Sequence, residues 1–87
     1  MLLVIDIGNT NIVVGIYDRN RLAHHWRLGT KKARTADEYG IMMMDLFNFG
    51  GIKRDSIDGD ILSCVVPPLT DTFLEMSEVY FKIKPIV

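Results

Sequence analysis

The residues best suited to chemistry lie near the start of the chain, where an acidic side chain at the end of an apolar run precedes a tight polar turn. Gly8 lets the backbone approach a ligand closely, and successive amides of such a turn form a concavity that binds anions. Neutral hydrogen-bond donors follow directly after it. The candidate phosphate-binding segment consists of Asp6, Ile7, Gly8, Asn9, Thr10, Asn11, Ile12 and Val13.

Asp6 adds a second requirement to this segment. An ionised carboxylate at the end of a buried strand is costly unless its charge is compensated, and no lysine or arginine lies within the turn. A metal ion is one candidate for this compensation. If the bound anion is a nucleotide phosphate, Asp6 repels it unless Mg²⁺ lies between them, so the segment predicts metal-bridged phosphate binding.

A plain hairpin turn explains the same residue types. Aspartate, asparagine and glycine are common in tight turns between strands. The phosphate-loop pattern G-x-x-x-x-G-K-[ST] is absent, and so is G-x-G-x-x-G between a strand and a helix. Because the turn leads into another strand, no helix dipole attracts an anion there. The residues alone therefore leave both interpretations open.

Three strands are expected to hold this turn in place. Residues 2–7 are almost all aliphatic, which is typical of a central strand covered on both faces. A second strand is predicted over residues 12–17 and a third over residues 22–28, where side chains follow a period of two. Short connections between them predict an antiparallel meander. His24 and His25 then point to opposite faces of the third strand and cannot ligate one metal.

Two helices and further strands complete the pattern. Thr35 and Glu38 have the spacing of a capping box, and Gly50 and Gly51 end the helix that it starts. A fourth strand over residues 61–65 leads to a second helix, which the proline pair at 67–68 starts. The apolar positions predicted for the two helices are Tyr39, Met42, Met43, Leu46 and Phe49, then Leu69, Phe73, Met76 and Tyr80.

The resulting order β-β-β-α-β-α-β predicts an α/β fold with a mixed sheet. Strands separated by a helix are expected to pair in parallel through right-handed crossovers, whereas the meander is antiparallel. Residues 84–87 form only the opening of a fifth strand. We therefore expect the fold to be incomplete at the C-terminus and the chain to be cut inside it.

Composition excludes several classes of function. The chain has 87 residues, with 10 basic and 11 acidic side chains and no basic run, which argues against nucleic acid or a membrane as partner. One cysteine excludes an internal disulfide, so a reducing cytoplasm is the expected location. Asp6 interrupts the apolar start well before it reaches the length of a signal peptide or a membrane span.

Four short motifs follow one another along the chain: D-I-G-N-T-N at 6–11, W-R at 26–27, R-T-A-D-E-Y at 34–39 and S-C-V-V-P-P-L-T at 63–70. In this order they resemble the N-terminal part of type III pantothenate kinases, a family in the superfamily of acetate kinase, sugar kinases, Hsp70 and actin. The likeness covers essentially the whole chain. It implies a ribonuclease H-like (actin-like ATPase) half-domain over residues 1–87, with the second lobe outside this chain.

The resemblance also implies a function. Type III pantothenate kinases transfer phosphate from ATP to pantothenate, which gives 4'-phosphopantothenate in the first step of coenzyme A synthesis. The family implies a cytoplasmic homodimer that uses Mg²⁺ and a monovalent cation, K⁺ or NH₄⁺. Carried over by position, the segment from Asp6 to Val13 binds the ATP phosphates, with Asp6 on the metal and Asn9 and Thr10 on phosphate. The family's catalytic aspartate lies beyond Val87, so this chain alone is expected to be inactive.

Other interpretations stay open. A non-catalytic accessory or regulatory relative keeps the fold, an inactive fragment retains only phosphate binding, and a different kinase of the superfamily shares the first motif alone. Arg34, Thr35, Asp37 and Glu38 either contact nucleotide or a partner subunit, or belong to a helix start stabilised by its capping box. Residues 65–68 either border the ligand cleft or form a rigid strand-to-helix turn.

Overall fold

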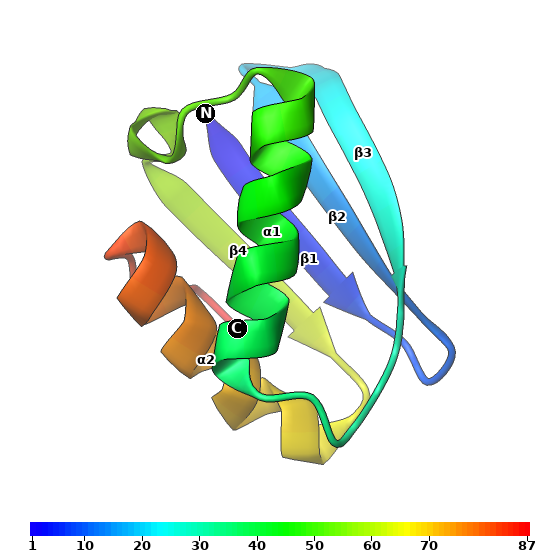
Figure 1. Ribbon diagram of the computed structural model, residues 1–87. Coiled ribbons are helices and arrows are strands. Elements are labelled where there is room, and N and C mark those ends of the chain that lie inside the picture. The colour runs from blue at the N-terminus through cyan, green and yellow to red at the C-terminus, as the bar shows by residue number, and fades with distance from the viewer.

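A four-stranded sheet with the order β3-β2-β1-β4 forms the base of the fold in a computed structural model that describes residues 1–87 (Figure 1). Strands β1 and β2 pair antiparallel, as do β2 and β3, whereas β1 and β4 pair in parallel. The predicted meander and the mixed sheet of the α/β class are therefore confirmed. The strands are β1 (Leu2–Ile7), β2 (Asn11–Asp18), β3 (Arg21–Gly29) and β4 (Gly59–Cys64).

The helices begin where their caps predict. Helix α1 (Ala36–Gly50) has the complete capping box between Thr35 and Glu38, and it ends at Gly51, whose φ of 69° is left-handed. Helix α2 (Pro67–Phe81) has proline in its first turn, and a short 3-10 helix η1 (Arg54–Ser56) precedes β4. The fourth strand begins at Gly59 rather than at residue 61 because its pairing with β1 already starts opposite Leu2.

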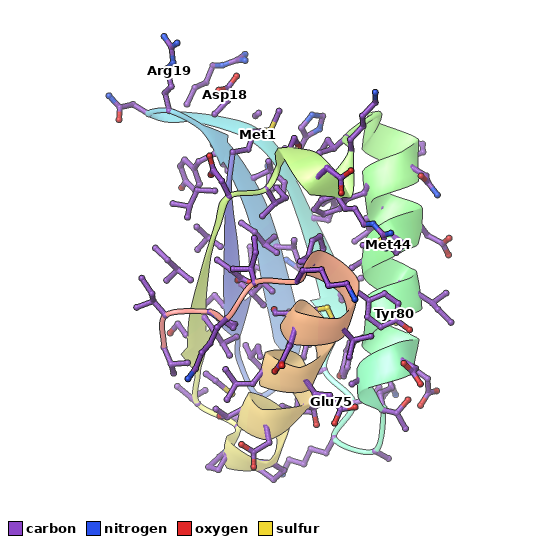
Figure 2. The ribbon with its side chains drawn as sticks, turned by 90° about the vertical axis from the view of Figure 1, so that its left-hand side faces the viewer. Met1, Asp18, Arg19, Met44, Glu75 and Tyr80 are labelled. Atoms are coloured by element: carbon purple, nitrogen blue, oxygen red, sulfur yellow. The ribbon has the colours of Figure 1, made fainter.

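Both helices lie on the same side of the sheet (Figures 1 and 2). Alternate residues from Leu3 to Ile7 in β1 and from Ile12 to Ile16 in β2 point toward them and are fully buried. The Tyr39 and Phe73 rings join the two helices, with centroids 4.6 Å apart, and the rings of Phe47 and Phe81 do the same at 5.2 Å. The strand residues of this core layer include Leu3, Ile5, Ile7, Ile12, Val14 and Ile16.

One predicted core position of α1 is wrong. Phe49 is 88% exposed, and Phe47, which the predicted stripe left out, is buried in its place. The two residues lie about 200° apart around a helix, so only one of them can face the sheet. Phe47 does so, close to Trp26 of β3.

The opposite face of the sheet carries no helix. Leu2 and Val4 are half-buried there, Asp6 is exposed, and Ile61 of β4 is 38% exposed. The expectation that residues 2–7 are covered on both faces is therefore wrong for this chain. Because α1 and α2 both cover one side, the aliphatic run of β1 has a single buried face.

The last residues run along the outer edge of β4. Ile86 forms a parallel bridge with Ile61, its amide donates to the Asp60 carbonyl at 2.8 Å, and its carbonyl accepts from the Leu62 amide at 2.8 Å. This is the pairing that the predicted opening of a fifth strand requires, although it amounts to an isolated bridge. Neither helix is long and apolar enough to cross a membrane.

Candidate functional site

The polar turn between β1 and β2 is closed by a hydrogen bond of its own. The Gly8 amide donates to the Asn11 carbonyl at 2.9 Å. A Cβ atom at Gly8 would lie only 3.1 Å from that carbonyl oxygen, so the turn favours glycine at this position. Asn9, Thr10 and Asn11 are exposed, and no hydrogen bond of the protein uses the amide of Asn9 or Thr10. The turn thus offers free donors to a ligand.

Two other segments flank the turn. From the loop after β3, Thr30 donates its amide to the Thr10 carbonyl at 3.0 Å and its hydroxyl to the Gly8 carbonyl at 2.8 Å. On the other side, the Val65 amide donates to the Ile7 carbonyl at 3.1 Å and extends the ladder past the end of β4. All three segments lie at the carboxyl end of β1 and β4 (Figure 1), where ligands of parallel strands commonly bind.

Asp6 lies on the face of the sheet that carries no helix. In the sheet register it stands between Val13 of β2 and Ser63 of β4, and it is exposed. Its carboxylate takes part in no salt bridge within the chain. The prediction of a buried Asp6 that needs compensation is therefore wrong, because β1 buries only its other face. The free carboxylate remains available to a ligand.

The donors at this end suit Mg²⁺ only in one binding mode. No group of three or more histidine, cysteine, aspartate or glutamate side chains in the chain could hold a metal ion. Mg²⁺, however, usually retains several waters and binds through one or two carboxylates together with substrate phosphates. A single exposed carboxylate such as Asp6, next to the free amides of the Gly8–Asn11 turn, fits that mode.

The other residues singled out from the sequence are occupied by structural contacts. The Arg34 guanidinium donates to the Gly29 carbonyl at 2.9 Å and lies over the Tyr39 ring, and Thr35 with Glu38 forms the capping box. Asp37 accepts a hydrogen bond from the Tyr80 hydroxyl at 2.9 Å. These contacts support the structural interpretation of the segment at residues 34–38.

The segment after β4 forms a strand-to-helix turn beside Ile7. The Cys64 thiol donates to the Val66 carbonyl at 3.1 Å, which fixes the exit from the strand. Pro67 and Pro68 have no amide hydrogen to offer, and the Leu69 amide is taken by Val66. The start of α2 is therefore a poor anion site, even though it lies at the same end as the turn.

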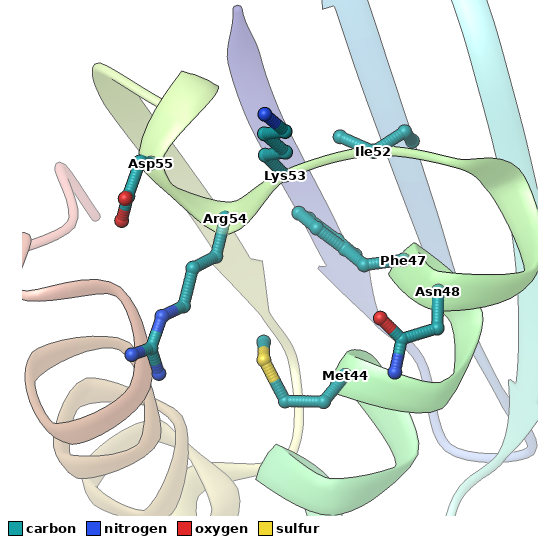
Figure 3. A pocket seen from close by; sticks show the side chains of 7 residues that line it. All are labelled: Met44, Phe47, Asn48, Ile52, Lys53, Arg54 and Asp55. Carbon is teal, nitrogen blue, oxygen red and sulfur yellow. The ribbon is translucent and has the colours of Figure 1, made fainter.

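The histidines and the cavities lie apart from the turn. His24 stacks on Trp26 with ring centroids 5.6 Å apart, whereas His25 is exposed on the other face, as predicted. A cavity of about 440 Å³ lies between the end of α1 and η1, at the other end of the molecule from the turn (Figure 3). Its lining consists of Met44, Phe47, Asn48, Ile52, Lys53, Arg54 and Asp55.

Sequence reasoning missed Thr30. Its partner Gly8 is 22 positions away, and nothing in the local pattern of residues 29–34 marks a contact with the first turn. The only available signal was the predicted pairing of the second and third strands, which brings the end of one beside the start of the other.

The family model for type III pantothenate kinase matches residues 2–87. The chain belongs to this family. The resemblance carried by the four motifs is thereby confirmed.

Relatives in the family are much longer than this chain. It is 55% identical to a type III pantothenate kinase of Geobacter sulfurreducens, 53% to one of Geotalea uraniireducens and 48% to one of an Exiguobacterium species. Each match covers 100% of this chain and 34% of the relative. The chain thus spans about a third of the length of these relatives and corresponds to the N-terminal portion of a type III pantothenate kinase.

Proposed function

We propose that the complete protein transfers the γ-phosphoryl group of ATP to pantothenate, and that this chain supplies its first phosphate-binding segment. A bond forms between phosphorus and the primary alcohol oxygen of pantothenate while the bond to the ADP oxygen breaks, so the products are 4'-phosphopantothenate and ADP. The observation that carries the proposal is the Gly8–Asn11 turn, with its free amides and exposed polar side chains at the carboxyl end of β1. Family membership supports the choice of substrates.

Each residue of the segment has a distinct part in this proposal. The amides of Asn9 and Thr10 are free and donate to phosphate oxygens, and the exposed side chain of Asn11 adds a further donor. Asp6 holds Mg²⁺, which neutralises phosphate charge when bound. Ile7, Ile12 and Val13 act by placing the turn, because two of them are buried under the helices and the third borders Asp6.

The remaining parts of the reaction belong to the rest of the protein. The base that accepts the alcohol proton is the family's catalytic aspartate, which this chain does not contain, and the same holds for the pantothenate contacts. We assign no residue of this chain to the monovalent cation, K⁺ or NH₄⁺. A cytoplasmic homodimer is the form of the enzyme that we propose.

The test is phosphate transfer by the complete protein. Formation of 4'-phosphopantothenate and release of ADP are measured with pantothenate and ATP, with Mg²⁺ and either K⁺ or NH₄⁺. We expect turnover that needs ATP, Mg²⁺ and pantothenate together. A correctly folded protein that binds ATP but yields no product under these conditions is instead an accessory or regulatory relative, and the proposed activity is then wrong.

A further inference from the structure

Thr30 is the one residue outside the turn that holds it through two hydrogen bonds. Its amide reaches the Thr10 carbonyl at 3.0 Å and its hydroxyl reaches the Gly8 carbonyl at 2.8 Å. The turn itself contributes the bond from the Gly8 amide to the Asn11 carbonyl. Two of these three bonds therefore depend on a residue that the first phosphate motif does not contain.

The hydroxyl bond determines the direction of a free amide. The Gly8 carbonyl and the Asn9 amide belong to one planar peptide group, in which the C=O and N–H bonds point in opposite directions. Thr30 draws the carbonyl toward the loop after β3. The Asn9 N–H consequently points away from Thr30, and the carbonyl, which would repel a phosphate, is occupied. The single bond from the Thr30 hydroxyl thus orients the Asn9 N–H and occupies the Gly8 carbonyl oxygen.

The loop that carries Thr30 is itself anchored to the helices. The Tyr39 hydroxyl accepts from the Lys31 amide at 3.0 Å and donates to the Lys31 carbonyl at 2.8 Å. Tyr39 is fully buried, and its ring packs on Phe73 of α2. Thr30 is therefore flanked by Gly29, which pairs with Asn11 of β2, and by Lys31, which is bonded to the packed helix layer.

We infer that Thr30 is a positioning residue for nucleotide phosphate, which acts by orienting the Gly8–Asn9 peptide, and that Tyr39 supports it through Lys31. This inference rests on the proposed function of the turn. It goes beyond that function because it assigns a role to residues that touch neither phosphate nor metal. Thr30 sets how well ATP binds, while the chemistry of transfer belongs to other residues.

The deciding experiment replaces the Thr30 hydroxyl by a methyl group. Thr30→Val keeps the shape of the side chain and the backbone amide bond but removes the donor to Gly8. In the complete protein we expect the KM for ATP to rise about tenfold with kcat changed less than about twofold, as loss of uniform binding predicts. Thr30→Ser retains a hydroxyl and is expected to restore most of the ATP affinity.

A second threonine provides a matched control, which tests whether loss of any threonine hydroxyl raises the KM for ATP. The Thr72 hydroxyl also donates to a backbone carbonyl, that of Pro68 within α2, at 3.3 Å. Thr72→Val should leave the KM for ATP unchanged. If Thr30→Val does not fold, Tyr39→Phe provides the second test, because it keeps the buried ring and removes both bonds to Lys31. We expect it to raise the KM for ATP in the same direction.

A nucleotide-free measurement separates this inference from the proposed function. Hydrogen exchange of the Gly8 amide reports the closure of the turn without any ligand, and Thr30→Val should accelerate it at least about fivefold. Unchanged exchange, with or without a change in KM, overturns the role of Thr30. Faster exchange with an unchanged KM for ATP confirms that Thr30 holds the turn and refutes phosphate binding by the turn. Faster exchange with a raised KM supports both.

Discussion

The Tyr80 ring of α2 lies directly over Gly40 of α1. A Cβ atom at Gly40 would be 2.3 Å from the nearest ring carbon, a distance that no packed side chain tolerates. The Tyr80 hydroxyl donates a hydrogen bond to the Asp37 carboxylate, one turn earlier on α1, at 2.9 Å. Glycine inside a helix costs about 1 kcal/mol relative to alanine, so the close approach of the two helices compensates for this loss.

Gly40→Ala should therefore destabilise the protein, although the same change in an exposed helix stabilises it. Displacement of the Tyr80 ring outweighs the gain in helix propensity, and we expect a net loss of about 1–3 kcal/mol in the free energy of unfolding. Chemical denaturation measures this loss. In the Tyr80→Ala background the same Gly40→Ala change should cost much less, and an equal cost in both backgrounds contradicts the proposed clash.

A buried carboxyl group makes stability depend on pH. Asp60 is 3% exposed beneath α2, and neither of its two carboxyl oxygens has a hydrogen-bond partner. Burial raises the pKa of the Asp60 carboxyl, with the nearby Ser77 hydroxyl opposing the shift. A raised pKa means that the folded state binds the proton more tightly than the unfolded state does. The stability contributed by this group is thus present below about pH 4 and is lost as pH rises through the folded-state pKa.

Asp60→Asn should remove this part of the pH dependence. We expect the free energy of unfolding of the variant to fall less than that of the parent protein between about pH 4 and pH 7. Denaturation midpoints at several pH values provide the measurement. Asp45→Asn, at an exposed position of α1, is the control and should follow the parent curve. Parallel curves for Asp60→Asn and the parent would show that Asp60 ionises normally in the folded state.

Asp6→Asn should abolish Mg²⁺-dependent ATP binding by the complete protein while leaving its thermal stability unchanged. The carboxylate is exposed and makes no salt bridge, so folding does not depend on its charge. Calorimetric titration with ATP, with and without Mg²⁺, measures the effect, and Asp45→Asn serves again as the control. Undiminished affinity for ATP in Mg²⁺ would refute the metal-binding role of Asp6.

Gly8→Ala should weaken ATP binding more than it weakens folding. The added methyl group would meet the Asn11 carbonyl at 3.1 Å and force the turn to open, which alters the direction of its free amides. We expect a rise in the KM for ATP of about tenfold, equivalent to about 1.4 kcal/mol. Gly29→Ala is the matched control, because a Cβ atom there meets nothing within 4 Å. Equal KM values for the two variants would contradict the tight turn.

The 87-residue chain alone should transfer no phosphate to pantothenate. It contains the segment that we propose to bind phosphate but not the aspartate that we expect to act as base, so ATP hydrolysis and transfer should both stay at background. A coupled assay of ADP release measures this directly. Turnover that disappears in Asp6→Asn would show that the chain is catalytically complete.

Local patterns in the sequence predicted most of the fold. The capping box of Thr35 and Glu38, the left-handed Gly51 and the prolines of α2 each determine the conformation of their own neighbours, so each was predictable from a few adjacent residues. The turn at Gly8 was predictable for the same reason.

Features that depend on distant contacts were not predictable. Whether both helices cover one face of the sheet decides if Asp6 is buried, and no residue near Asp6 carries that information. The choice of Phe47 over Phe49 depends on how α1 is rotated against the sheet. Asp60 lies outside the fourth strand predicted over residues 61–65, yet pairing with β1 draws it into that strand and under α2.

The bonds from Thr30 also limit how this site can be transplanted. A synthetic peptide that copies residues 1–18 contains every letter of the first motif but lacks the hydroxyl that orients its central peptide group. Adding Thr30 requires the third strand, and fixing Thr30 requires Tyr39 and the helix layer on which it packs. To keep its geometry in another protein, the motif must therefore be transferred together with the third strand and the helix layer.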